Sequence, residues 1–185
     1  MSISPESFLK HLIIREILFF TGVPDSLLKY LCLCIDNRKD LKNNHIITSN
    51  EGSAIGLASG YHIGTNKIPL VYMQNSGIGN AINPILSLSD SKVYSIPMLI
   101  LIGWRGEPGV KDEPQHLSQG EVQIDLLNSL KLPYNIISGE STDYKMKIDY
   151  GLDIAKKKQA PFVILIKKNT FSKIKFDSNK KRKNI

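Results

Sequence analysis

The segment 45–84, "HIITSNEGSAIGLASGYHIGTNKIPLVYMQNSGIGNAINP", decides the fold of this protein. Its pattern predicts a strand at 45–49, a helix rich in small residues at 51–64 and a second, almost continuously apolar strand at 68–74. The turn "NSGIGN" then leads into another helix at 81–89. Such a strand–helix–strand unit is right-handed and joins two parallel strands of one sheet.

The same alternation continues on both sides of this unit. Further strands are predicted at 18–24, 96–103, 134–137 and 161–167, and further helices at 4–17, 25–35, 120–130 and 143–158. Apolar strands that alternate with helices indicate a parallel sheet covered on both faces. We therefore expect an α/β fold, a three-layer, doubly wound domain with a central, mostly parallel sheet of about six strands.

Length and charge place this domain within residues 1–166. The chain has 185 residues, which is enough for one domain with a sizeable core. The net charge of +7 arises in residues 167–185, because residues 1–166 hold equal numbers of acidic and basic side chains. We expect 167–185 to be a basic, flexible tail, and nucleic-acid binding through it is the less favoured alternative.

The sequence indicates neither a membrane segment nor a secretory leader. No apolar run reaches the roughly 18 residues of a membrane helix, and the N-terminus lacks a basic region followed by a long apolar core. Cys32 and Cys34 stand two residues apart in a predicted helix, so their side chains point to different faces and no mutual disulfide is expected. Free thiols and a cytoplasmic location are the expectation, and no residue is assigned as a metal ligand.

Polar or glycine-rich segments follow four of the predicted strands. They are "TGVPDS", "TSNEGS", "MQNSGIGN" and "GWRGEPGVKDEPQH". Ligands of doubly wound sheets bind at the carboxyl ends of the strands, so any site should be built from these segments. The "NSGIGN" turn is only part of a dinucleotide fingerprint, since Ile82 stands where the third glycine belongs. A plain nucleotide-binding domain is therefore a less favoured alternative.

Glu51 has two interpretations. An acid in the first turn of a helix is favoured by the helix dipole and could be a surface cap. The small residues that follow at helical spacing, Gly52, Gly56 and Gly60, would instead allow another backbone or a flat ligand to approach closely. In that case Glu51 is a functional carboxylate at the opening of an apolar unit.

The segment 103–116 is also open to two interpretations. It is either a salt-bridged surface loop or an anion site, in which cationic side chains hold a phosphonate, phosphate or carboxylate. The candidates for that role are Arg105, Lys111 and His116, with Glu107, Asp112 and Glu113 beside them.

Four long and unusual strings carry a resemblance to a known family. They are "FFTGVPDSLLK", "NEGSAIGLASGYH", "YMQNSGIGNAINPILSL" and "LILIGWRGEPGVKDEPQH". The chain resembles, from about Phe19 to Phe171, the pyrimidine-binding half of the phosphonopyruvate decarboxylase family. These thiamine-diphosphate-dependent enzymes convert 3-phosphonopyruvate to phosphonoacetaldehyde and carbon dioxide in phosphonate biosynthesis. The related sulfopyruvate decarboxylases share the architecture.

The resemblance implies catalytic roles for two carboxylates. Glu51 matches the glutamate that hydrogen-bonds N1′ of the cofactor's aminopyrimidine and thereby activates the cofactor. Asp25 matches a loop where an acid assists proton transfer. The expected cofactor contacts are made by Glu51, Gln74, Asn75 and Gly77, and the expected substrate contacts by Asp25, Ser26, Ser76, Arg105, Lys111 and His116, the last three for their charge and loop position.

The family also binds magnesium and the cofactor's diphosphate through a Gly-Asp-Gly motif, which this sequence lacks. The resemblance therefore implies that the diphosphate- and magnesium-binding domain is absent and that the isolated chain is inactive. We expect a homo- or hetero-oligomer with a subunit that supplies this domain, with thiamine diphosphate and Mg²⁺ as cofactors and a small 2-oxo acid as substrate. Two alternatives stay open: a sulfopyruvate decarboxylase alpha-type subunit, and a non-catalytic binding or interaction remnant of a truncated decarboxylase.

Overall fold

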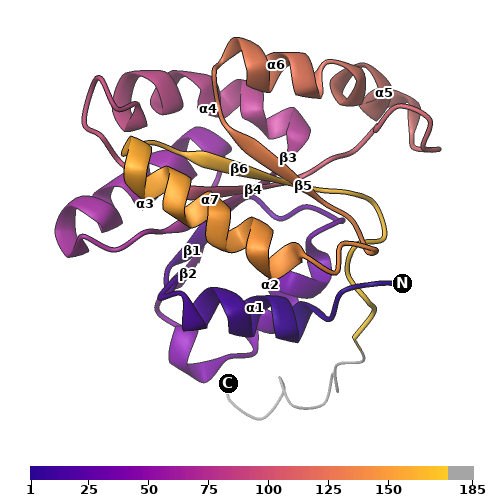
Figure 1. Cartoon of the computed structure of the whole chain (residues 1–185), viewed down its shortest axis with the longest axis horizontal. Helices are drawn as coiled ribbons and strands as arrows, with labels where there is room; N and C mark the ends of the chain where they lie inside the picture. Colours follow the sequence, from indigo (N-terminus) through magenta and orange to yellow (C-terminus); the bar gives the residue numbers. More distant parts are fainter. Residues whose placement is uncertain (175–185) are drawn as a thin grey trace.

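All six strands of the sheet run parallel. The computed structural model describes residues 1–174, and its strand order is β2-β1-β3-β4-β6-β5 (Figure 1). The strands are β1 (Phe20–Gly22), β2 (His45–Ile47), β3 (Leu70–Gln74), β4 (Leu99–Gly103), β5 (Tyr134–Ile137) and β6 (Phe162–Ile166). The predicted fold class, a doubly wound α/β domain with about six strands, is confirmed.

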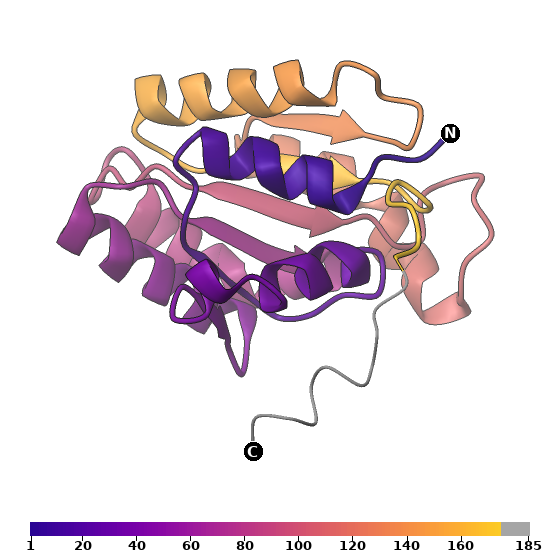
Figure 2. The ribbon, with the colours of Figure 1, turned by 90° about the horizontal axis from the view of Figure 1, so that it is seen from below.

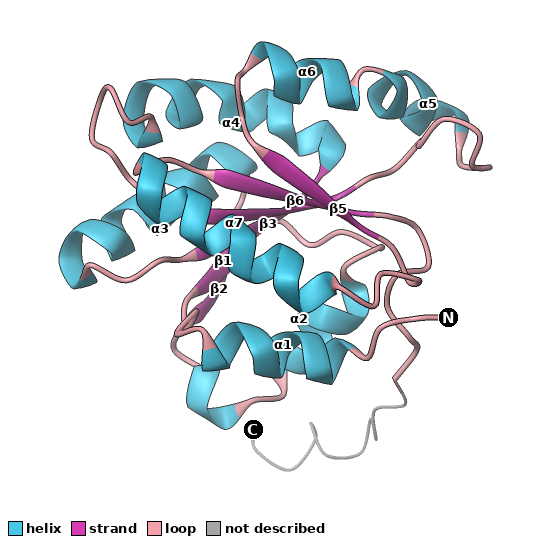
Figure 3. Cartoon of the chain, in the orientation of Figure 1, coloured by secondary structure: helices cyan, strands magenta, loops and turns pink. Residues whose placement is uncertain are grey.

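Helices cover both faces of this sheet. They are α1 (Pro5–Ile14), α2 (Lys29–Asp36), α3 (Glu51–Thr65), α4 (Ile78–Pro84), α5 (Pro114–Glu121), α6 (Gln123–Ser129) and α7 (Tyr144–Lys158), with the short helical turns η1 (Lys39–Leu41), η2 (Asn75–Gly77) and η3 (Ile85–Ser89). Helices α1, α2 and α7 pack on one face, whereas α3, α4 and α6 pack on the other. Figure 2 looks onto the first of these faces, and Figure 3 shows the helices around the strands.

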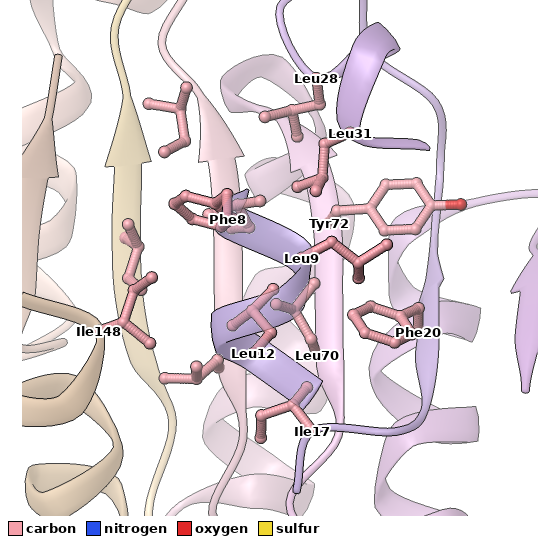
Figure 4. Packing of buried hydrophobic residues seen from close by; sticks show 14 of the residues in the cluster. Phe8, Leu9, Leu12, Ile17, Phe20, Leu28, Leu31, Leu70, Tyr72 and Ile148 are labelled. Atoms are coloured by element: carbon pink, nitrogen blue, oxygen red, sulfur yellow. The ribbon is translucent and has the colours of Figure 1, made fainter. Parts of the chain in front are cut away.

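The alternation of side chains along each strand separates two hydrophobic cores. In β3, Leu70 and Tyr72 belong to the cluster under α1, α2 and α7, whereas Val71 and Met73 belong to the cluster under α3, α4 and α6. Figure 4 shows the first cluster, in which the apolar side chains of α1 face the strands. Every residue of the central strands β4 and β6 is buried, which explains their continuous apolar sequence.

The region that follows β4 differs from the prediction. The segment 103–116 was expected to be a loop and the next helix to span 120–130, but α5 already begins at Pro114. A proline suits the first position of a helix because its missing N–H is not needed there. Position 120 lies inside α5 and is occupied by glycine, because a Cβ atom there would be 1.7 Å from the carbonyl oxygen of Gly106. This distant contact, rather than local propensity, explains the glycine.

The predicted tail is partly packed against the domain. Thr170 and Phe171 are buried, and the N–H of Ile3 donates to the carbonyl of Thr170 at 2.8 Å. Residues 167–174 are therefore part of the folded body. The prediction of a flexible tail at 175–185 falls outside the described residues and stays a prediction.

Two smaller expectations concern the described part of the chain. Cys32 and Cys34 are free thiols in α2, as predicted. Within residues 1–174, none of the helices combines the length and apolar character that crossing a bilayer requires.

The connections that leave β1 and β3 lead to opposite faces of the sheet. After β1 the chain enters α2, which packs on the first core, and after β3 it enters η2 and α4, which pack on the second. A reversal of this kind between neighbouring strands opens a crevice at their carboxyl ends. The fold thus favours a site between the ends of β1 and β3.

Candidate active site

Glu51 is not a surface cap. It is the first residue of α3 and only 9% exposed. The helix is capped by the preceding residue, because the side chain of Asn50 accepts a hydrogen bond from the N–H of Ser53 at 2.8 Å. Since α3 has its own cap, the burial of a carboxylate at this position needs another explanation.

The carboxylate of Glu51 lies against the turn that follows β3. Asn80 of α4 donates a hydrogen bond to its Oε2 atom at 2.8 Å. Gly77 leaves room for the side chain, since a Cβ atom there would be 2.3 Å from Oε1. Within residues 1–174, Oε1 accepts no hydrogen bond, so one oxygen is fixed by the protein while the other can accept from a ligand.

The glycines of α3 lie in two different environments. A Cβ atom at Gly52 would be 2.8 Å from the carbonyl oxygen of Asn80, so α3 and α4 approach closely here, as predicted. A Cβ atom at Gly56 or Gly60 would meet nothing within 4 Å. These two glycines therefore lie on an open side of the helix.

Asp25 is the second buried carboxylate, in the turn after β1. Its Oδ2 atom accepts a hydrogen bond from the N–H of Leu27 at 3.0 Å, whereas Oδ1 is buried with no hydrogen-bond partner among the described residues. Gly103 at the end of β4 makes room for it, because a Cβ atom there would be 2.1 Å from Oδ2. Burial raises the pKa of Asp25, so this acid retains its proton to higher pH than an exposed aspartate.

Arg105 joins the ends of β4 and β1. Its guanidinium forms a bidentate ion pair with Asp112, in which Nε donates to Oδ2 at 2.8 Å and Nη2 donates to Oδ1. Nη1 donates to the hydroxyl of Ser26 at 2.7 Å. The hydrogen bonds from Arg105 hold the pKa of Asp112 well below its usual range, so Asp112 remains charged.

Asn75 fixes the main chain of the same arginine. Its amide nitrogen donates to the carbonyl of Arg105 at 2.9 Å, and its amide oxygen accepts from the N–H of Arg105 at 3.2 Å. Asn75 is fully buried. The sequence predicts a direct contact between Asn75 and a cofactor, and such a contact would require the two hydrogen bonds between Asn75 and Arg105 to open. The geometry gives Asn75 the role of joining the ends of β3 and β4.

The remaining predicted residues are more loosely organised. Gln74 donates to the hydroxyl of exposed Ser76 at 2.7 Å. The exposed Lys111 contributes its carbonyl to a hydrogen bond from Lys168, and His116 lies half-buried in α5. In residues 1–174, the side chains of Lys111 and His116 make no hydrogen bond or ion pair, so contacts do not join them to Arg105.

The sequence did not single out a cavity of about 340 Å³ beside Asp25 and Ser26. Its wall includes His45, whose Nδ1 and Nε2 lie 2.8 Å from Asp36 Oδ1 and from the Tyr72 hydroxyl. Asn80 was also missed. No local pattern marks these residues, because their partners come from other elements.

Comparisons with known proteins agree with this geometry. Residues 7–128 match the family model described as thiamine pyrophosphate enzyme, N-terminal TPP binding domain. The chain is 35% identical over 148 residues to sulfopyruvate decarboxylase subunit alpha of Methanococcus maripaludis, which covers 80% of this chain and 84% of that protein. It is 36% identical over 124 residues to phosphonopyruvate decarboxylase of Streptomyces viridochromogenes, which covers 66% of this chain but only 29% of that enzyme.

The fold is shared with a solved structure. Benzoylformate decarboxylase from Polynucleobacter necessarius superposes with a TM-score of 0.69 over 96% of this chain and 32% of the other, at 19% identity. At this identity the likeness concerns the fold alone. The family match and the relatives above 30% identity establish more: the chain belongs to the thiamine pyrophosphate enzyme family and contains its N-terminal TPP-binding domain.

Proposed function

We propose that this chain is the pyrimidine-binding half of a decarboxylase that acts on a small 2-oxo acid bearing a phosphonate or sulfonate. The observation that carries the proposal is the buried carboxylate of Glu51, which has one oxygen held by Asn80 and the other without a hydrogen-bond partner among residues 1–174. Thiamine diphosphate, when bound, supplies a nucleophilic carbon and an electron sink for the departing carbon dioxide.

The residues around Glu51 fit an aminopyrimidine. Oε1 is free to accept a hydrogen bond from a protonated ring nitrogen, and burial strengthens such a bond. Asn80 prevents the carboxylate from turning away, Gly77 leaves room for the Glu51 side chain, and Gly52 lets α3 lie close to Asn80. In this role Glu51 stabilises a proton on the pyrimidine, which is an orienting and electrostatic contribution of the protein.

The strand ends beside Glu51 suit the substrate. Asp25, with its raised pKa, can deliver or take up a proton at the reacting carbon. Ser26 and Arg105 present a hydroxyl and a guanidinium at the same edge of the sheet, where they can hold the substrate's anionic group. The two named relatives act on sulfopyruvate and phosphonopyruvate and are almost equally similar to this chain, so we retain both substrates.

A second domain or subunit completes the site in this proposal and holds the diphosphate with Mg²⁺. The name of the Methanococcus relative, "subunit alpha", supports a partner chain. So does the open side of α3, where Gly56 and Gly60 adjoin Leu57 and Ile63, which are 37% and 68% exposed. A partner that covers this side would bury the exposed apolar side chains of α3.

The experiment is an assay of the purified chain, alone and with a partner that contains a Gly-Asp-Gly domain, in the presence of thiamine diphosphate and Mg²⁺. Both 3-phosphonopyruvate and 3-sulfopyruvate are offered. We expect turnover only with the partner. Robust turnover by the chain alone would disprove the shared site. If no combination binds the cofactor, the alternative of a non-catalytic remnant is favoured.

A further inference from the structure

The orientation of Arg105 depends on the fold of the segment that separates it from Asp112. Asp112 accepts two of the guanidinium's hydrogen bonds, and its Oδ2 atom also accepts from the N–H of Gly106 at 2.9 Å. We call residues 106–112 the turn segment. Residues 107–111 are all half-buried or exposed, so the middle of this segment has little packing of its own. It therefore needs contacts with other parts of the chain to keep one conformation.

Two lysines that directly follow β6 supply such contacts. Lys167 forms an ion pair with Glu107, and the ammonium group of Lys168 donates to the carbonyl of Lys111 at 2.6 Å. Figure 2 shows the segment after β6, in yellow, and the loop after β4 at the same end of the sheet. The side chain of Glu107 is only 12% exposed, so removal of Lys167 would leave a poorly solvated, unpaired carboxylate.

The main chain that carries these lysines is itself fixed. The N–H of Lys167 donates to the carbonyl of Ile137 in β5 at 3.0 Å, and its carbonyl accepts from the hydroxyl of Thr170 at 2.8 Å. Thr170 is 1% exposed. The N–H of Trp104 donates to the carbonyl of Ile166 at 2.9 Å, which joins the chain just after β4 to the end of β6. The lysines thus connect the turn segment to a rigid part of the sheet.

We infer that Lys167 and Lys168 are positioning residues, which hold the turn segment in the conformation that lets Arg105 bind the anionic group of the substrate. The inference rests on the proposed function for the substrate role of Arg105 and adds two residues to that site. Neither lysine needs to touch the substrate. They raise the fraction of chains in which the turn segment is closed, and the apparent affinity for an anion falls in proportion when that fraction falls.

The decisive variant is Glu107→Gln, because it weakens the ion pair and removes a negative charge at once. The full ¹⁵N-labelled chain is titrated with methylphosphonate, and the amide signals of Ser26, Arg105 and Gly106 are followed by NMR. If the pair positions the turn segment, Glu107→Gln should weaken methylphosphonate binding by roughly fivefold. If the lysines act on the anion by charge alone, the same variant should bind methylphosphonate more tightly than the parent does.

The other variants show whether one shared contact is responsible. Lys167→Met should weaken binding to a similar extent, and its combination with Glu107→Gln should lose little more than either change alone. Lys167→Arg keeps the charge and can pair with Glu107, so it should retain most of the affinity. Glu140→Gln is the matched control. Glu140 lines the same cavity of about 370 Å³ as both lysines, but within residues 1–174 its carboxylate forms no ion pair, so no loss is expected.

A second measurement needs no ligand. Hydrogen exchange of the Gly106 amide, which donates to Asp112, should be faster in Lys167→Met and in Lys168→Met than in the parent, while the urea unfolding midpoint changes little. In the reconstituted enzyme both variants should raise KM with little change in kcat.

Two results would overturn the inference. One is unchanged or tighter binding of methylphosphonate by Glu107→Gln when the parent chain binds it. The other is unchanged exchange of the Gly106 amide in both lysine variants. If methylphosphonate does not bind the parent chain while the exchange at Gly106 responds, the substrate role proposed for Arg105 fails and the positioning of the turn segment stands.

Discussion

Replacement of Gly77 by alanine tests the geometry around Glu51 with a single methyl group. The backbone of Gly77 has φ −73° and ψ −14°, which alanine adopts without strain. The added Cβ would be 2.3 Å from Oε1 of Glu51 and 2.5 Å from its Cδ. Since ordinary contacts of a Cβ begin near 3.4 Å, the carboxylate must move by roughly 1 Å.

A displacement of this size should affect turnover far more than stability. A shift of about 1 Å in a catalytic group can lower the rate by about 10²-fold. The Asn80 hydrogen bond to Glu51, worth about 1 kcal/mol, is weakened, while alanine in place of glycine returns about 0.4–1 kcal/mol by restricting the unfolded chain. We therefore expect about 10²-fold lower kcat and a free energy of unfolding within about 1 kcal/mol of the parent.

The assays are steady-state turnover in the reconstituted enzyme and urea unfolding of the chain. Gly79→Ala is the matched control, because a Cβ atom there would meet nothing within 4 Å. Added to Glu51→Gln, Gly77→Ala should cause little further loss, since groups that act as a unit are not additive. Turnover of Gly77→Ala equal to that of the parent would refute the claim that the position of Glu51 matters.

The layers of the fold could be predicted because each strand carries its own signal. Strands buried on both faces must be apolar at every position, and β4 and β6 meet that requirement. The helix α5 could not be predicted in the same way. Its Gly120 breaks the local helical signal and is required by contact with Gly106, fourteen residues earlier, so the sequence near α5 does not contain the reason for it.

The residues of the candidate site also differ in how far the sequence alone can identify them. Glu51 could be singled out from the residues themselves because it is a single acid beside glycine and apolar residues at a strand end, whereas Asp25 was singled out only through the family resemblance. Asp112 was one of three acids in its segment, with Glu107 and Glu113, and composition alone cannot say which of them pairs with Arg105. That choice depends on the turn at residues 106–113, which brings the N–H of Gly106 to the same carboxylate.

The other consequences concern three side chains that the sequence singled out. Glu51→Gln should lower turnover of the reconstituted enzyme by about 10²–10⁴-fold yet leave the unfolding midpoint nearly unchanged, because a glutamine oxygen still accepts from Asn80; full activity would exclude a catalytic carboxylate. Asn75→Ala should reduce the free energy of unfolding in urea by about 1–3 kcal/mol, since the carbonyl of Arg105 loses its partner and the N–H of Arg105 keeps only its 3.2 Å bond to the carbonyl of Gly103; a loss below about 0.5 kcal/mol would contradict the role of Asn75 in joining the ends of β3 and β4. Asp25→Asn should make the chain progressively more stable than the parent as the pH rises. Burial raises the pKa of Asp25 in the native state, so the native chain binds its proton more tightly than the unfolded chain does. The parent therefore has the full benefit of this group below the unfolded pKa of about 3.9 and loses it as the pH increases through the higher native pKa. The amide does not titrate and avoids this loss. Urea unfolding at a series of pH values above about 4 measures the difference, and a difference that stays constant across the series would show that the native state does not disfavour the charged form of Asp25.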